Sequence, residues 1–197
     1  MPTVISHAVV GAGLFLAVGH GRPGARAGAW TAAAVAMLPD LDALFMRWIP
    51  YEAAWGHRGM THSLSFAVVA GLAAAFALRR SVAIPGGTWG LAVLLAAVAA
   101  THGLLDALTD GGGGVALLAP FSDARFRLPW RPIPVAPLVY VPYLWWVLLV
   151  EAWMLWPSAL ALATVRRSLR PPVRAASLAA LAASAVPWLF PMGLRPA

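Results

Sequence analysis

The stretch TWGLAVLLAAVAATHGLLDAL, residues 88–108, decides the fold class. It is almost entirely apolar, and it is long enough to cross a bilayer, which takes roughly 20 helical residues. Its two ionisable side chains, His102 and Asp106, stand four residues apart near its end, so a helix presents them on one face. The stretch therefore predicts a membrane-spanning helix that carries a polar pair.

The rest of the chain has the same apolar character. Of its 197 residues, 61% are hydrophobic and only 11% are charged, and the mean hydropathy is +0.77. Soluble domains carry about 25% charged residues, so the composition excludes a soluble enzyme and a disordered chain. The absence of cysteine excludes a disulfide-stapled secreted domain. We therefore expect residues 1–197 to form a single polytopic membrane domain.

Apolar runs predict an all-α bundle of about six transmembrane or partly re-entrant helices. We place the runs at residues 4–19, 27–38, 62–78, 88–108, 136–163 and 174–191. The first two are short for a bilayer. The run 136–163 contains Pro157, so it is expected to form either one tilted helix or a kinked helix.

The charge distribution predicts the orientation. The net charge is +7, from 14 basic against 7 acidic residues. With six spans, one face carries eight arginines and no acid, and the other carries six arginines and most of the acids. By the positive-inside rule, the acid-free face is expected to be cytoplasmic. The sequence thus predicts a multi-pass protein of a prokaryotic inner membrane, with no nucleic-acid partner.

Polar side chains gather at the opposite, extracytoplasmic face. Ionisable residues near a membrane are costly, so they usually pair, line a cavity or bind something. The candidate metal ligands at this face are His7, Asp40, Asp42, His57, His62, His102 and Asp106. Imidazole and carboxylate ligands without thiolate suit zinc, with manganese or iron as alternatives. The set is larger than one tetrahedral ion needs, so one or two divalent ions are expected.

Local patterns refine this set. His62 follows His57 by five positions, so both reach one point only if His57 lies in a loop. Pro39 predicts a turn that carries Asp40 and Asp42. Asp110 continues the helical face of Asp106 by four residues.

Further residues are candidates for catalysis and binding. Asp42 or His57 could act as the general base. Four arginines could hold a phosphate by forked hydrogen bonds, namely Arg58, Arg125, Arg127 and Arg131.

Structural interpretations of the same residues remain open. His102 and Asp106 could form a buried hydrogen-bonded pair, and Asp40 or Asp42 could cap a helix. The polar cluster could serve as a proton relay. The arginines could extend to lipid headgroups, and the glycines at 111–114 are typical of a flexible turn.

The ordered motifs resemble those of a known family. They are His7, PDLD at 39–42, HRGMTHS at 57–63, HGLLDALTDGGGGVALLAPFS at 102–122 and RFRLPWRPIPVAP at 125–137. Over about residues 1–140 the chain resembles the YdjM-like family, whose members are described as LexA-binding, inner-membrane-associated and predicted to be metal-dependent hydrolases. The resemblance implies a membrane metallohydrolase whose motif residues are the seven candidate ligands. The extra glycines after Thr109 depart from the family pattern.

We therefore expect a metal-dependent hydrolase that acts on a membrane lipid or lipid-linked substrate. A site at headgroup depth favours a phosphoester such as a phospholipid or a polyprenyl phosphate. One alternative is a transporter or channel for metal ions or protons, which predicts polar residues at more than one depth. Another is a non-catalytic membrane scaffold with a structural metal.

Overall fold

The computed structural model describes residues 2–136, 141–164 and 171–189, and over these residues the chain is helical, with no β-strand. The expected all-α class is thereby confirmed. The elements are α1 (Val4–Gly19), α2 (Ala25–Met37), the 3-10 helices η1 (Leu38–Phe45) and η2 (Met60–His62), α3 (Leu64–Leu78), α4 (Gly87–Ala107), α5 (Val141–Met154), α6 (Trp156–Thr164) and α7 (Pro171–Leu189).

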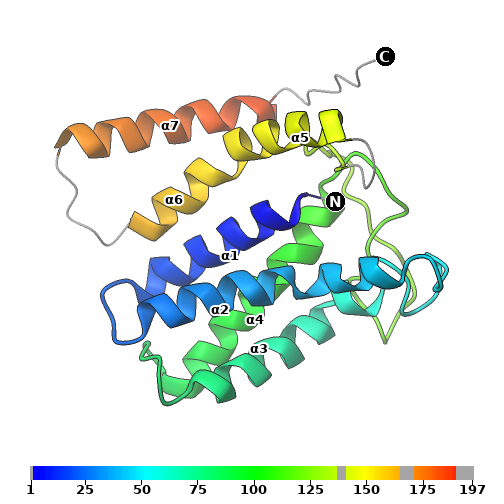
Figure 1. The fold of residues 1–197 in the computed structure, drawn as a ribbon, viewed down its shortest axis with the longest axis horizontal. Helices are drawn as coiled ribbons and strands as arrows, with labels where there is room; N and C mark the ends of the chain where they lie inside the picture. The colour runs from blue at the N-terminus through cyan, green and yellow to red at the C-terminus, as the bar shows by residue number, and fades with distance from the viewer. Residues whose placement is uncertain (1, 137–140, 165–170, 190–197) are drawn as a thin grey trace.

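Two antiparallel helix pairs, α1–α2 and α3–α4, form the main bundle (Figure 1). Short turns join the helices of each pair at one end, and these turns carry Arg22, Arg79 and Arg80. Helices α5, α6 and α7 lie on the side of α1 away from α3. The long segments 46–59 and 108–136 lie at the other end of the bundle, where α1 and α3 begin.

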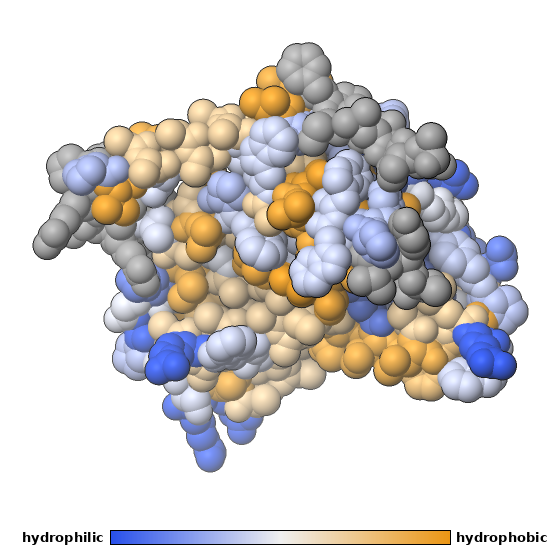
Figure 2. All heavy atoms as spheres, turned by 45° about the horizontal axis from the view of Figure 1, so that its top comes forward, coloured by the Kyte–Doolittle hydropathy of each residue, from blue (hydrophilic) through white to orange (hydrophobic). Residues whose placement is uncertain are grey.

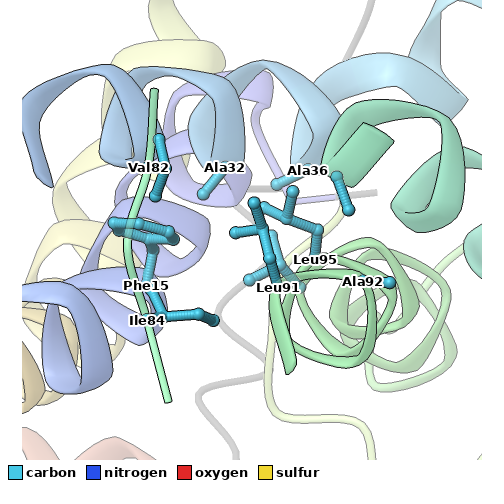
Figure 3. Packing of buried hydrophobic residues seen from close by; sticks show 10 residues of the cluster. Phe15, Ala32, Ala36, Val82, Ile84, Leu91, Ala92 and Leu95 are labelled. Atoms are coloured by element: carbon cyan, nitrogen blue, oxygen red, sulfur yellow. The ribbon is translucent and has the colours of Figure 1, made fainter. Parts of the chain in front are cut away.

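Small residues bring the helices close together. Figure 3 shows Phe15 beside Ala32 and Val82, and Leu91 and Leu95 opposite Ala36. A Cβ atom at Gly28 would clash with the ring of Phe15, so this glycine makes room for the largest side chain of the cluster. Close packing through Ala and Gly is typical of membrane helices, which gain little from the hydrophobic effect between them.

Among the described residues, two helices are long and apolar enough to cross a membrane, Gly87–Ala107 and Pro142–Thr164. The second is interrupted at Leu155, where α5 gives way to α6. Pro157 lacks the N–H that would bond the carbonyl of Trp153, so the predicted run 136–163 is the kinked alternative. The other predicted spans correspond to shorter helices, and the six-span arrangement stays a prediction.

The surface is apolar between two polar ends. Figure 2 shows hydrophobic and weakly polar residues across the middle of the face it presents, and the most hydrophilic residues mainly at the two ends. Large side chains such as Trp30, Val93 and Leu149 are mostly exposed. A surface of this kind matches lipid better than water.

Candidate metal centre

One end of the helical bundle gathers all seven histidines and aspartates that the sequence singles out as ligands. Helices α1 and α3 begin at this end and α2 and α4 finish there (Figure 1). The seven are His7 on α1, Asp40 and Asp42 on η1, His57 in the loop before η2, His62 on η2, and His102 and Asp106 on α4. Six of them are buried, and the side chain of the seventh, Asp40, is only 7% exposed.

The turn predicted at Pro39 is instead a helix. Residues Leu38–Phe45 form η1 directly after α2, with Pro39 in the first turn. Proline is tolerated there because first-turn N–H groups need no partner within the helix. Asp42 is buried, whereas the preceding Leu41 is 54% exposed. The 3-10 helix thus turns its carboxylates toward the interior of the protein and Leu41 toward the surface.

Helix α2 holds the ring of His102 in one tautomer. Its Nδ1 lies 2.7 Å from the carbonyl oxygen of Ala36, and because a carbonyl only accepts, Nδ1 carries the proton. Ala36 is in the last turn of α2, where carbonyls can accept from outside the helix. Gly103 lets η2 approach, since a Cβ there would stand 2.5 Å from the carbonyl oxygen of His62. His102 therefore directs its Nε2 at His62.

His62 presents the same kind of atom from the opposite side. Its Nδ1 lies 3.2 Å from Asp42 Oδ2, and its Nε2 lies 3.1 Å from Nε2 of His102. Two lone pairs at this distance repel each other unless a proton or a metal ion lies between them. Carboxylate oxygens of Asp40, Asp42 and Asp106 lie 3.2–3.8 Å from the nitrogens of the His62 ring. The environment therefore favours a positive charge.

The surrounding ligand atoms have no hydrogen-bond partner among the described residues. They are both ring nitrogens of His7 and both carboxylate oxygens of Asp40 and Asp106. Oδ1 of Asp40 lies 3.4 Å from Nε2 of His102 and 3.8 Å from Nε2 of His62. Nitrogen and oxygen ligands of a tetrahedral zinc ion stand roughly 3.3 Å apart. These separations fit ligands of one ion, and buried polar atoms are rarely left unpaired without such a role.

Asp106 faces two histidines with different oxygens. Its Oδ1 lies 3.5 Å from Nε2 of His7, and its Oδ2 lies 3.4 Å from Nε2 of His62. The rings of His7 and His102 are stacked with centroids 3.7 Å apart, and one ligand atom each of His7, His102 and Asp106 lies within 4.8 Å of the other two. Two-metal sites hold their ions about 3.5–4 Å apart. The buried groups could therefore hold one metal ion or two that share Asp106.

Asp42 and His57 form a dyad beside this cluster. Nδ1 of His57 lies 2.6 Å from Asp42 Oδ1, and the hydroxyl of Thr61 donates to Oδ2 at 2.6 Å. Burial raises the pKa of Asp42, but its hydrogen bonds with His57, His62 and Thr61 hold that pKa below its usual range. The ionised carboxylate fixes the proton of His57 on Nδ1 and leaves Nε2 as an acceptor. These three residues, Asp42, His57 and His62, also have the mutual spacing of a metal site.

Comparison with known proteins places the chain in a family. It matches the family model described as YdjM inner membrane protein over residues 1–190. The chain belongs to the YdjM family. The match extends well beyond residue 140, where the motifs that carry the resemblance end.

A YdjM-family relative supports the location. Inner membrane protein YbcI of Escherichia coli (strain K12) is 38% identical over 161 residues, which cover 79% of this chain and 91% of the relative. No solved structure matches the chain. Together with the two apolar helices, the relative supports an inner-membrane location for this YdjM-family chain.

Arg58, a predicted phosphate ligand of this YdjM-family chain, is buried and makes its contacts within the protein. It is 2% exposed and has a left-handed backbone with φ of 62°, a conformation that costs about 1–3 kcal/mol for a non-glycine residue. Its Nε lies 3.0 Å from Asp106 Oδ2 without alignment for a hydrogen bond. Its terminal nitrogens donate to the carbonyl of Gly111 and to the hydroxyl of Thr109. Arg58 thus fastens the glycine-rich loop to the centre.

The other predicted phosphate ligands lie farther out. Arg125 donates to the backbone carbonyls of Tyr51 and His57 and stands over the Tyr51 ring at 4.4 Å. Arg127 is exposed, and Arg131 donates to the carbonyl of Asp110 at 3.5 Å. Contact of these arginines with a substrate stays a prediction.

Several sequence interpretations are corrected. Asp110 does not continue the face of Asp106, because α4 ends at Ala107 and Asp110 accepts the N–H of Val135 at 2.8 Å. No hydrogen bond joins His102 to Asp106 in the described part of the chain, since His102 bonds Ala36.

Two structural contacts escaped the sequence interpretation. The hydroxyl of Tyr51 donates to the carbonyl of Gly114 and accepts the N–H of Gly113, which shapes the glycine run. Glu151 bonds the start of α1. Its signal was its position as an acid in the apolar run 136–163.

Proposed function

We propose that this protein is a metal-dependent hydrolase of the inner membrane that cleaves a phosphoester of a membrane lipid. One observation carries the proposal. The facing Nε2 atoms of His62 and His102 stand among carboxylate oxygens that have no hydrogen-bond partner in the described chain, directly beside the Asp42–His57 dyad. This arrangement combines the ligands of a divalent cation with a group that can take up a proton.

The donor set fits a divalent metal. The cluster contains three carboxylates and the guanidinium of Arg58, which pairs with Asp106, so unprotonated histidines would leave a net negative charge that a divalent cation offsets. The residues that would hold it are His7, Asp40, His62, His102 and Asp106. When bound, such a metal supplies Lewis acidity, which polarises a phosphoryl oxygen and lowers the pKa of an attacking water.

The dyad provides the proton acceptor. Asp42 holds the Nδ1–H of His57, so Nε2 of His57 is free to accept a proton from water and to return it to a leaving oxygen. His57 and Arg58 line a pocket of about 180 Å³ together with Tyr51 and Gly112, which come from two different loops. This pocket offers water a route to the dyad.

Position favours a lipid substrate. The centre lies at one end of the helices of an inner membrane protein, and phosphate headgroups lie at the ends of membrane helices. A phosphoester there is already concentrated by the bilayer.

Metal analysis tests the proposal. We expect detergent-purified protein, prepared without chelators, to contain stoichiometric zinc, manganese or iron, and Asp106→Ala and His62→Ala to lose it while they stay folded. Asp123→Ala removes an exposed carboxylate and should keep the metal. The metal-loaded wild type should release phosphate from phosphoester lipids, whereas His57→Gln should bind metal and turn over roughly 100-fold more slowly.

Other results would replace the proposal. Wild-type protein without metal would make the cluster a packing or proton-relay network. Metal uptake into proteoliposomes that His102→Ala abolishes would make the protein a transporter. Global unfolding on metal removal, with no turnover of any lipid, would make it a scaffold with a structural metal.

A further inference from the structure

Two apolar grooves lie on either side of η1. The first has a volume of about 540 Å³ and lies between η1 and the helices α1 and α2. The second has about 430 Å³ and lies between η1, the loop that follows it and the start of α3. Leu38 and Leu41 line both grooves. These two leucines therefore form a ridge that separates two hydrophobic spaces.

Each groove meets the metal centre through one carboxylate. Asp40 lines the first groove and Asp42 lines the second, and each is the one ionisable residue among the described residues that line its groove. Asp40 has a side chain that is 7% exposed, and both of its oxygens lack a hydrogen-bond partner in the described chain. Both hydrophobic spaces thus converge on the cluster that could bind metal.

The rims of the grooves suit hydrocarbon. Trp30 and Leu44 border the first groove, Trp55 borders the second, and all three are at least 60% exposed. Tryptophan is enriched at the level where lipid headgroups meet acyl chains. Because the chain belongs to a family of inner membrane proteins, the molecules that surround these rims are lipids.

We propose that the two grooves hold the two acyl chains of a glycerophospholipid whose phosphate faces the metal centre across the ridge of η1. This inference rests on the proposed function for the identity of the centre, and it names the substrate class. Two separate spaces on one short helix match a lipid with two chains joined at one headgroup. A single-chain polyprenyl phosphate or lysophospholipid would fill only one of them.

Photolabelling tests where the chains lie. The full-length protein is reconstituted in phosphatidylethanolamine vesicles with a trace of diacyl phosphatidic acid that carries a diazirine in each acyl chain. We expect labelled peptides from residues 30–44 and from residues 45–66, in the same reconstituted sample. Excess diacyl phosphatidic acid should compete, and lysophosphatidic acid should compete at least roughly tenfold less well, because burial of two methylene groups already changes affinity by about that factor.

A matched pair of variants tests the first groove. Ala34 is exposed and lines this groove, whereas Ala97 is exposed on α4 away from it. Ala34→Trp should lower labelling of residues 30–44 by roughly tenfold, and Ala97→Trp should leave it unchanged. Circular dichroism checks that both variants are folded, and the wild-type labelling map decides the question if either is not.

Labelling needs no turnover, so the two proposals fail separately. Labels spread evenly over exposed helix positions such as Val69 and Val93 would show ordinary annular lipid and overturn the groove proposal. Equal competition by lysophosphatidic acid would also overturn it. Hydrolysis of diacyl lipids without groove labelling would keep the hydrolase and reject the grooves. Groove labelling in a protein that binds no metal would support the lipid site and reject the hydrolase.

Discussion

Ser6 and His7 are neighbours on α1, yet they belong to two buried polar clusters of opposite character. Ser6 faces Glu151, whose side chain is fully buried and whose carboxylate accepts the N–H of Thr3 at 2.8 Å and the hydroxyls of Thr3 and Ser6 at 2.5 and 2.6 Å. His7 faces Asp106 and has no hydrogen-bond partner for either ring nitrogen among the described residues.

Glu151 stabilises the fold through its hydrogen bonds. The carboxylate oxygens of Asp40 and Asp106 have no hydrogen-bond partner among the described residues. The Glu151 cluster satisfies its donors and acceptors internally, and Trp156 donates to the same Ser6 hydroxyl at 3.1 Å. Such a cluster needs nothing more than the protein. The centre of His7, Asp40 and Asp106 contains mainly acceptor atoms that have no hydrogen-bond partner among the described residues, and such a set suits a cation.

Removal of Glu151 should have the largest effect on the fold. Glu151→Ala strands a buried N–H and two hydroxyls, each worth about 1–3 kcal/mol. We expect the free energy of unfolding to fall by about 4 kcal/mol, measured by titration with a denaturing detergent and circular dichroism. The metal content of the folded fraction should not change.

The exposed Glu52 provides the control for this substitution. Glu52→Ala should alter the free energy of unfolding by less than about 0.5 kcal/mol. If folded Glu151→Ala protein lost its metal, the two clusters would not be separate, and Glu151 would belong to the functional site.

Asp106→Asn should lower metal affinity and leave the fold intact, which is the reverse of the effect expected for Glu151→Ala. The amide keeps the shape of the side chain but loses the charge and one acceptor, so metal affinity should fall by more than about 100-fold. Fluorescent chelator competition measures the affinity. The helical signal should persist, because neither carboxylate oxygen of Asp106 has a hydrogen-bond partner among the described residues.

Asp110→Asn is the matched control on the same segment. Its Oδ1 accepts the N–H of Val135 outside the centre, and an amide oxygen can still do so. Metal affinity should stay at the wild-type value. If Asp106→Asn lowered the free energy of unfolding as much as Glu151→Ala, the Asp106 cluster would also stabilise the fold, and the two clusters would not differ in role.

The sequence was sufficient to place the ligands at one end of the bundle. The apolar runs predicted antiparallel helices, and the positions of His7, His62 and His102 near the ends of those runs predicted that they meet. These features can be predicted because the helical period and the order of the connections follow from the sequence pattern alone.

The fine structure of the centre could not be predicted in this way. The tautomer of His102 depends on a carbonyl of Ala36 in another helix, and the left-handed backbone of Arg58 depends on a loop that folds around it. The role of Glu151 depends on contact with residues about 150 positions away. Such long-range contacts leave no periodic signal in the sequence.

The smallest expected effects come from two neighbouring hydroxyls, one that orients the candidate ligands and one that stabilises the helix that follows them. Thr61 donates to Asp42 at 2.6 Å, and Ser63 caps α3 by accepting the N–H of Phe66 at 3.1 Å. Thr61→Val removes the hydroxyl that helps Asp42 orient His62, so metal affinity should fall by about fivefold, equivalent to about 1 kcal/mol.

Ser63→Ala removes only the cap, so it should lower the free energy of unfolding by about 1 kcal/mol and leave metal affinity unchanged. Chelator competition measures the metal affinity of both variants, and titration with a denaturing detergent measures their free energy of unfolding. A loss of metal affinity in Ser63→Ala as large as that in Thr61→Val would mean that the centre responds to any loosening of η2 and α3. Loss in Thr61→Val alone means that the hydrogen bond to Asp42 itself sets the geometry of His62, which makes Thr61 a positioning residue for the candidate metal centre.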